Sequence, residues 1–170
     1  MFKGACVMIE LAPYSPFYEA ATLRRIDAFW GFHSGLVGRE TEDSPAAEDL
    51  RRWTDDGHTL LVILEGGADV GFVHLQRSGP IVMELADIFV DEARRGCGIA
   101  SAAIGLAEEY ARTLPGVEAM ILQVVTRNEA ALRLYHKLGY DTMSMATLRK
   151  EFGENRRNRQ ARFLGLDFKI

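Results

Sequence analysis

The chain has 170 residues, of which 48% are apolar and 26% are charged, and its net charge is −4. This length and apolar content fit one compact domain over residues 1–170, and the negative charge gives no reason to expect a nucleic-acid partner. Cys6 and Cys97 form no disulfide framework, and the four histidines lack metal-ligand spacing. We therefore expect a cytoplasmic protein without a metal. No apolar run reaches the ~18 residues of a membrane span, so no membrane contact is expected.

The first half of the chain predicts one strand, two helices and three more strands. A strand over 7–11 precedes Ser15-Pro16, which begins a helix running to about residue 32. Ser44-Pro45 begins a shorter helix through about residue 53. Strands follow over 59–65, 70–77 and 82–90, joined by turns too short for anything but antiparallel hairpins.

The second half changes to alternating helices and strands. A helix is predicted over 98–114, a buried strand over 119–125 and a helix over 128–138 that Gly139 ends. A strand, a helix and a strand in succession imply a right-handed parallel crossover. Strands over 142–150 and 162–168 are expected to complete the chain. The predicted fold is α/β (α+β) with a mixed sheet of about seven strands, antiparallel early and parallel in the middle, flanked by about four helices.

A glycine-containing turn lies between the strand over 82–90 and the helix that follows it. Arg95-Gly96-Cys97-Gly98 directs backbone N–H groups and the positive end of the helix dipole toward one point, an arrangement that suits a phosphate. Without a Cβ at 96 and 98, the backbone can approach that phosphate closely. On its own the turn is equally an ordinary helix start. A dinucleotide fingerprint is disfavoured because Ser101 stands where a third Gly or Ala belongs.

A second motif, thirty residues after Gly98, comprises Asn128, Ala131, Tyr135 and Leu138-Gly139-Tyr140. Together with Ile88-Phe89-Val90 and residues 95–100, it resembles the GNAT superfamily of N-acetyltransferases, over nearly the whole chain. The resemblance implies a GNAT-like fold and an enzyme that moves an acetyl group from acetyl-CoA to a primary amine by direct attack in a ternary complex. An alternative of the same fold is a catalytically silent acyl-CoA-binding domain that regulates or contacts a partner.

The resemblance also implies where acetyl-CoA binds. The pyrophosphate would lie on the N–H groups of residues 95–100, and the pantetheine arm along 88–90 like an extra strand. The parallel strands would separate near Val90 and Gln123 to admit that arm, which Asn128 would also contact. The implied cofactor-binding residues are Ile88, Phe89, Val90, Arg95, Gly96, Cys97, Gly98, Ile99, Ala100 and Asn128.

Two catalytic residues are expected, an acid and a base. By resemblance, Tyr135 protonates the departing thiolate, although its place on an apolar stripe also fits a core tyrosine. The amine must lose a proton, and Glu84 is the first candidate base, because it interrupts an apolar strand and matches a glutamate that many GNAT enzymes carry where this strand bulges. Asp87 is the second candidate, and structural pairing with water as the base is the third. Gln123 cannot accept a proton at neutral pH.

The substrate is the least determined part. Residues 39–56 carry more acidic than basic side chains, which favours a cationic amine such as a polyamine, an aminoglycoside or a lysine side chain. The alternative is that this segment is only a solvated acidic surface. The aromatic and glycine residues 29–38 could close over a small molecule, with His33 as a loop residue. The basic segment 149–162 is expected to be a solvated loop. GNAT proteins often form dimers through their last strands, so a homodimer is one expectation.

Overall fold

The structure is a computed structural model that describes residues 8–37, 45–153 and 159–170. The chain forms two compact units, Met1–His33 with Thr41–Gln123, and Ser34–Glu40 with Val124–Ile170. Each unit is described by itself, and the single domain expected over 1–170 stays a prediction. In the described ranges no helix is long and apolar enough to span a membrane.

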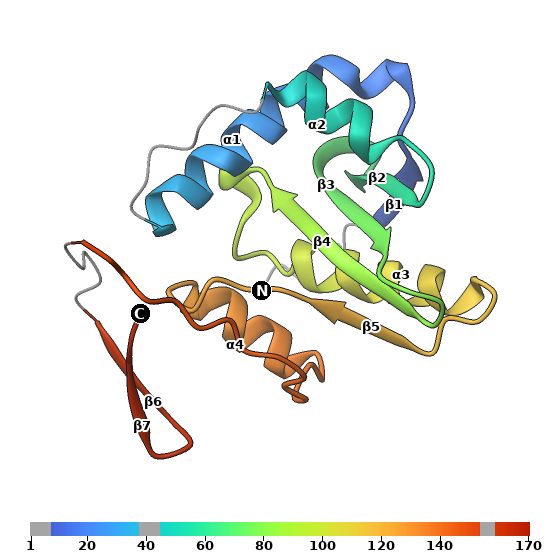
Figure 1. The fold of residues 1–170 in the computed structure, drawn as a ribbon. Helices are drawn as coiled ribbons and strands as arrows, with labels where there is room; N and C mark the ends of the chain where they lie inside the picture. The colour runs from blue at the N-terminus through green and yellow to red at the C-terminus, as the bar shows by residue number, and fades with distance from the viewer. Residues whose placement is uncertain (1–7, 38–44, 154–158) are drawn as a thin grey trace, which may run out of the picture. The chain divides into compact units, whose positions relative to one another are not determined.

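The first unit contains a five-stranded mixed sheet in the order β1-β2-β3-β4-β5 (Figure 1). Its strands are β1 (Ile9–Pro13), β2 (His58–Glu65), β3 (Ala68–Arg77), β4 (Val82–Val90) and β5 (Ala119–Leu122). Neighbouring strands are antiparallel except β4 and β5, which are parallel. This confirms the predicted change from antiparallel to parallel pairing.

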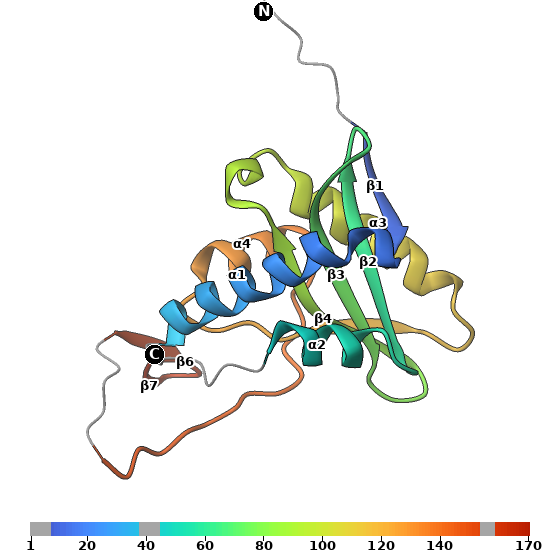
Figure 2. The same ribbon diagram turned by 90° about the horizontal axis from the view of Figure 1, so that it is seen from above.

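Helices cover both faces of this sheet (Figure 2). α1 (Glu19–Val37) and α2 (Ala46–Trp53) pack on one face, and α3 (Ile99–Thr113) packs on the other. A short 3-10 turn, η1 (Pro16–Tyr18), precedes α1. The cluster beneath α1 and α2 joins Ile26, Phe29, Trp53 and Phe72, all at most 5% exposed. α3 buries small and branched side chains, among them Ala103 and Ile104, as expected for a helix packed closely on a sheet.

α1 is longer than the predicted helix, which ended near residue 32. It continues through Gly31 and Gly35 to Val37, so the segment expected to be a glycine loop is largely helical, and His33 is a helix residue. A glycine costs a helix about 1 kcal/mol. Ring contacts offset that cost: the His33 ring lies 4.4 Å from that of Phe29, one helical turn earlier. Gly38 and the residues to 44 lie outside the described ranges.

The second unit contains α4 (Glu129–Lys137) and a two-stranded hairpin of β6 (Gln160–Phe163) and β7 (Leu166–Lys169). Asn128 caps α4, since its side chain accepts a hydrogen bond from the Ala131 N–H. Gly139, at φ 97°, ends the helix, and the Tyr140 N–H donates to the Tyr135 carbonyl across the last turn. Both ends were predicted from the residue types.

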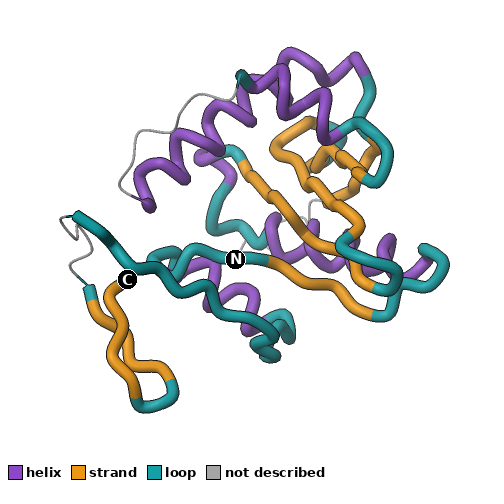
Figure 3. The backbone as a smooth tube through the Cα atoms, in the orientation of Figure 1, coloured by secondary structure: helices purple, strands orange, loops and turns teal. Residues whose placement is uncertain are grey.

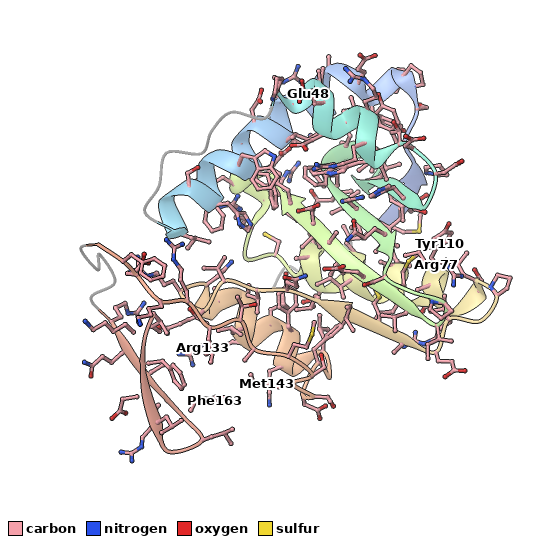
Figure 4. All side chains as sticks on the ribbon, in the orientation of Figure 1. Glu48, Arg77, Tyr110, Arg133, Met143 and Phe163 are labelled. Carbon is pink, nitrogen blue, oxygen red and sulfur yellow. The ribbon has the colours of Figure 1, made fainter. Side chains whose placement is uncertain are left out.

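Two predicted strands at the C-terminal end are wrong. Residues 142–150 form a loop rather than a strand (Figure 3), and the side chain of Met143, labelled in Figure 4, is 69% exposed. Alternating residues form a strand only beside a partner, and β6 and β7 pair with each other. The strand expected over 162–168 is instead interrupted by a turn at Leu164 (φ 49°) and Gly165 (φ 79°). The seven strands therefore form a sheet of five and a hairpin.

Candidate active site

The pairing of the two parallel strands stops halfway along β4. The ladder runs from Val82 opposite Ala119 to Leu85 opposite Leu122, and then ends. Past this point, β4 is paired within the described strands only with β3, over residues 87–90. Figure 1 shows β4 and β5 diverging here. One backbone edge of residues 86–90 therefore has no strand partner among the described strands.

A β-bulge lies in β4 where the β4–β5 ladder ends. Leu85 pairs with Leu75 and Asp87 pairs with His74, so Ala86 is an extra residue in β4. Residues 84 and 87 would point to opposite faces of a regular strand, but one inserted residue reverses the alternation. Both carboxylates therefore lie on the sheet face that α1 and α2 cover. The family resemblance implied a bulge near Glu84, whereas the residue types of the strand alone do not indicate one.

Glu84 is a buried carboxylate held by two amides. It is 6% exposed. Gln76 Nε2 donates to one carboxylate oxygen at 3.0 Å, and Gln123 Nε2 donates to the other at 3.1 Å. The hydrogen-bond donors to Glu84 thus come from β3 on one side and from the residue directly after β5 on the other. Gln123, excluded as a base, is one of its partners.

Asp87 begins a line of polar groups that crosses three strands. Its Oδ2 lies 2.7 Å from His74 Nδ1, and His74 Nε2 lies 2.9 Å from His58 Nδ1. The His74 ring is stacked on Trp53 at 4.6 Å and is 2% exposed. Neither histidine was singled out from the sequence, because their spacing of sixteen residues has meaning only once β2 and β3 are paired in this register.

The glycine turn has the backbone that its sequence predicts. β4 passes through a 3-10 turn, η2 (Glu92–Arg94), into Gly96 at φ 77° and Gly98 at φ 82°. A Cβ at either glycine would meet nothing within 4 Å, so the glycines are required by the backbone conformation. The first backbone bond that α3 makes runs from the Ala102 N–H to the Gly98 carbonyl at 3.1 Å.

The N–H groups that open α3 can therefore hold an anion. This fits the expected phosphate turn with one correction, because the Arg95 N–H donates to the Glu92 carbonyl at 3.2 Å. The donors that fit are those of residues 96–100, where Cys97 is exposed and Ile99 is buried as the first residue of α3.

The Arg95 side chain is fixed between two rings. Its guanidinium carbon lies 5.2 Å from the ring centres of both Phe32 and Phe89, and its Nε donates to the Val90 carbonyl at 3.0 Å. Arg95 and the two phenylalanines line a cavity of about 610 Å³, together with Arg24 and Arg25 of α1. The contribution of α1 was not predicted, because Phe32 was assigned to the end of the helix and the start of a loop.

Arg25 anchors this end of the sheet. Its guanidinium donates to both carboxylate oxygens of Asp91 at 2.8 Å and to the Asp69 carboxylate at 2.6 Å. Hydrogen bonds to Asp91 are the largest of the effects that raise the pKa of Arg25. The start of the glycine turn is thereby tied to α1 and to the β2–β3 turn.

In the second unit, Tyr135 and Asn128 both lie on α4 or at its start. Tyr135 is half-buried, and its ring centre lies 6.1 Å from that of Tyr140. Asn128 Oδ1 accepts from the Ala131 N–H at 3.2 Å. Asn128 is therefore the N-cap that was considered for it, whereas Tyr135 is not a fully buried core residue, and the functional roles of both stay predictions.

The acidic segment expected to attract a cation is partly used in the fold. Asp49 is 1% exposed and accepts from Trp30 Nε1 at 2.6 Å and from Arg52 at 2.5 Å. Residues 39–44 of that segment, and 154–158 of the basic one, lie outside the described ranges.

Burial lowers the pKa of His33, and the charge of Asp87 opposes that shift. Across the described residues, no group of three His, Cys, Asp or Glu side chains could hold a metal ion.

Comparisons with known proteins agree with this geometry. The profile of the Acetyltransferase (GNAT) family matches residues 23–140. A mycothiol acetyltransferase from Salinispora arenicola (strain CNS-205) is 29% identical, over 75% of this chain and 47% of that protein. The chain thus spans about half the length of that curated relative.

Solved structures share the fold at lower identity. A putative acetyltransferase (YycN) from Bacillus subtilis is 20% identical with a TM-score of 0.65, covering 86% of this chain and 100% of that one. The enzyme AAC(6')-Iy, in complex with a CoA-containing bisubstrate analogue, is 14% identical with a TM-score of 0.60, covering 85% of this chain and 98% of that one. On the family match, the chain belongs to the GNAT family of acetyltransferases.

Proposed function

We propose that this protein transfers an acetyl group from acetyl-CoA to a primary amine by direct attack in a ternary complex. The observation that carries the proposal is the end of the β4–β5 ladder at Leu85 and Leu122, directly before the glycine turn at residues 96–98. An open strand edge leading to free N–H groups suits a ligand with an extended amide arm and a phosphate at its end.

The arm would lie along Ile88, Phe89 and Val90, and the pyrophosphate on the N–H groups of residues 96–100. Asn128 would contact the arm. When bound, acetyl-CoA supplies the thioester that the amine attacks. The protein's residues orient the two substrates and move two protons: one leaves the ammonium group of the acceptor, and one reaches the departing sulfur.

Glu84 would take the proton of the acceptor, and the Tyr135 hydroxyl would give one to the thiolate. Support for Glu84 comes from its burial and from the two amide donors that fix both of its oxygens. The two hydrogen bonds fix the orientation of the carboxylate, and each oxygen keeps a second lone pair that can receive a proton. Asp87, on the same face, is the competing base.

A cationic amine is the acceptor class we favour. Two carboxylates, Glu84 and Asp87, lie on the face that would bind it, and neither forms an ion pair with Lys or Arg among the described residues. Two solved neighbours carry names that refer to aminoglycoside acetyltransferases, which supports testing that class beside polyamines and lysine peptides.

The test is a turnover screen with acetyl-CoA across these amine classes, measuring the free thiol of CoA. Binding of acetyl-CoA is measured in parallel by calorimetry. We expect thiol release that depends on the amine. Binding without turnover on any amine would instead support the acyl-CoA-binding regulatory domain, and absence of both would reject the proposed function.

A further inference from the structure

The line from Asp87 through His74 to His58 is not used by the reaction as proposed above, and it connects a candidate active-site carboxylate to the start of β2, where His58 is half-buried. Its three members come from β4, β3 and β2, and each is within hydrogen-bond distance of the next. His74, in the middle, is buried and stacked between two rings, Trp53 at 4.6 Å and His58 at 5.1 Å. An imidazole fixed so tightly has one orientation available.

The hydrogen bonds assign the tautomers. Asp87 is an acceptor as a carboxylate, so His74 carries its proton on Nδ1 and donates it to Oδ2. In its neutral form, His74 then has a lone pair on Nε2 and accepts from His58 Nδ1–H. The lone pair of His58 is consequently on Nε2, the nitrogen that makes no contact with His74.

We propose that His74 and His58 are positioning residues for acetyl transfer: they hold Asp87 as an oriented carboxylate that binds the ammonium group of the acceptor, and proton uptake at His58 weakens that binding. The proposal rests on the proposed function. No hydrogen bond to Asp87 Oδ1 is present among the described residues, and the Asp87 side chain is 15% exposed, so this oxygen is available to an acceptor.

The coupling to solvent is one proton transfer. A hydronium ion gives its proton to His58 Nε2, the N–H bond at His58 Nδ1 breaks, and a new one forms at His74 Nε2. His74 becomes an imidazolium ion beside Asp87, and the pair of rings has gained one positive charge. The carboxylate is then neutralised by its own neighbour and attracts an ammonium group less strongly.

Other charged groups adjust this titration. Burial is the main cause that lowers the pKa of His58, followed by the charges of His74 and Arg52, and Asp55 opposes them. At the other end, Asp87 faces His33 of α1, whose pKa burial also lowers, and Glu84 lies on the same face of β4. Because the pKa of His58 is lowered from 6.5, the effect on acceptor binding belongs to mildly acidic solution.

The kinetic test uses variants of His58 in the whole protein. In the wild type, we expect the KM for the amine to rise about tenfold as the pH falls from about 7.5 to 5.5, with a smaller change in kcat. His58→Asn keeps an N–H donor in the place of Nδ1 but cannot titrate, so its KM should stay flat between about pH 7.5 and 5.5. His136→Asn, the same change at an exposed histidine of α4, should keep the wild-type profile.

His74→Phe tests the middle of the line. It keeps a ring on Trp53 and removes both hydrogen bonds, so KM should be raised at every pH, as in Asp87→Asn, and combining the two changes should add little. A lower melting temperature with an unchanged KM would overturn the proposal. A KM for His58→Asn that still rises in acid as the wild type does would also overturn it.

A measurement on the ligand-free protein separates this proposal from the function it rests on. Imidazole NMR titrations should show that the titration of His58 changes in both His74→Phe and Asp87→Asn, because each change breaks the line through which His58 is coupled to the carboxylate. His58 unaffected by both changes would reject the coupling whether or not any amine is acetylated. If the coupling is present and no amine reacts, the proposed function fails alone.

Discussion

Among single residues, Glu84 and Asp87 differ in their surroundings more than in their chemistry. The Glu84 carboxylate accepts hydrogen bonds from two neutral amides, whereas the Asp87 carboxylate is hydrogen-bonded to an imidazole, a group that can carry charge. An amide-bound carboxylate has a fixed charge environment, and a histidine-bound one has an environment that pH can change. This difference supports proton acceptance at Glu84 and acceptor binding at Asp87.

Replacing Glu84 by Gln should lower kcat/KM about 10²-fold near neutral pH if Glu84 is the base. Raising the pH should partly restore the rate, because free amine becomes abundant. Gln76 and Gln123 can rotate their amides to meet the new group, so the fold should survive. The readout is a pH profile of initial rates. Asp87→Asn is the matched variant, and neutral-pH activity that is lost there but kept in Glu84→Gln would move the role to Asp87.

Replacing Tyr135 by Phe should lower kcat by about 10²-fold, because the acid for the thiolate is removed. The affinity for acetyl-CoA should hardly change, since the ring stays. Steady-state kinetics and calorimetry measure the two effects. Tyr140→Phe makes the same chemical change on the neighbouring ring and serves as control. A wild-type kcat in Tyr135→Phe would leave that residue with a structural role alone.

At the level of elements, the start of α3 and the end of β4 decide how the cofactor would bind. Gly98→Asp should weaken acetyl-CoA binding by more than tenfold (over ~1.4 kcal/mol) because it puts a negative charge at the predicted phosphate site. The control is Gly79→Asp in the β3–β4 turn, which also has a positive φ and open space around its Cβ position. Equal affinities in the two variants, measured by calorimetry, would show that the turn does not hold the cofactor.

Gly71 of β3 keeps β4 in place. A Cβ there would lie 2.2 Å from the Phe89 carbonyl oxygen, so Gly71→Ala must displace the strand beside the predicted pantetheine edge. We expect a loss of about 1–3 kcal/mol in unfolding free energy, measured by thermal or urea unfolding. Gly105→Ala in α3 meets nothing within 4 Å and should stabilise the helix by up to ~1 kcal/mol. Stabilisation by both changes would contradict this account of Gly71.

The elements also separate what the sequence could predict from what it could not. β4 was predicted with its exact bounds because its apolar run ends at clear turn residues, and α4 was predicted to within one residue at each end because Asn128 and Gly139 are strong end signals. The bulge at Ala86 and the pairing of His74 with His58 depend on the register of three strands, which local patterns do not contain. The helical course of α1 through Gly31 depends on ring packing that outweighs propensity.

For the molecule as a whole, the histidines predict how stability varies with pH. The pKa values of His33 and His58 are lowered from 6.5, chiefly by burial in both cases. The unfolded chain therefore binds more protons than the folded one just below pH 6.5, so stability is fully present above that pH and is lost as the pH falls below it. Urea unfolding between about pH 5 and 8 tests this. The double variant His33→Asn/His58→Asn should have a flatter profile, and an unchanged slope would assign the pH dependence to other groups.

The short β4–β5 ladder has one more consequence. A strand edge with unpaired backbone groups is a template for adding another strand, from a ligand or from a neighbouring chain. Under the proposed function, acetyl-CoA completes the hydrogen bonding of the sheet, so the supply of donor also protects the protein from self-association. Preparations depleted of CoA would then self-associate more than preparations saturated with acetyl-CoA.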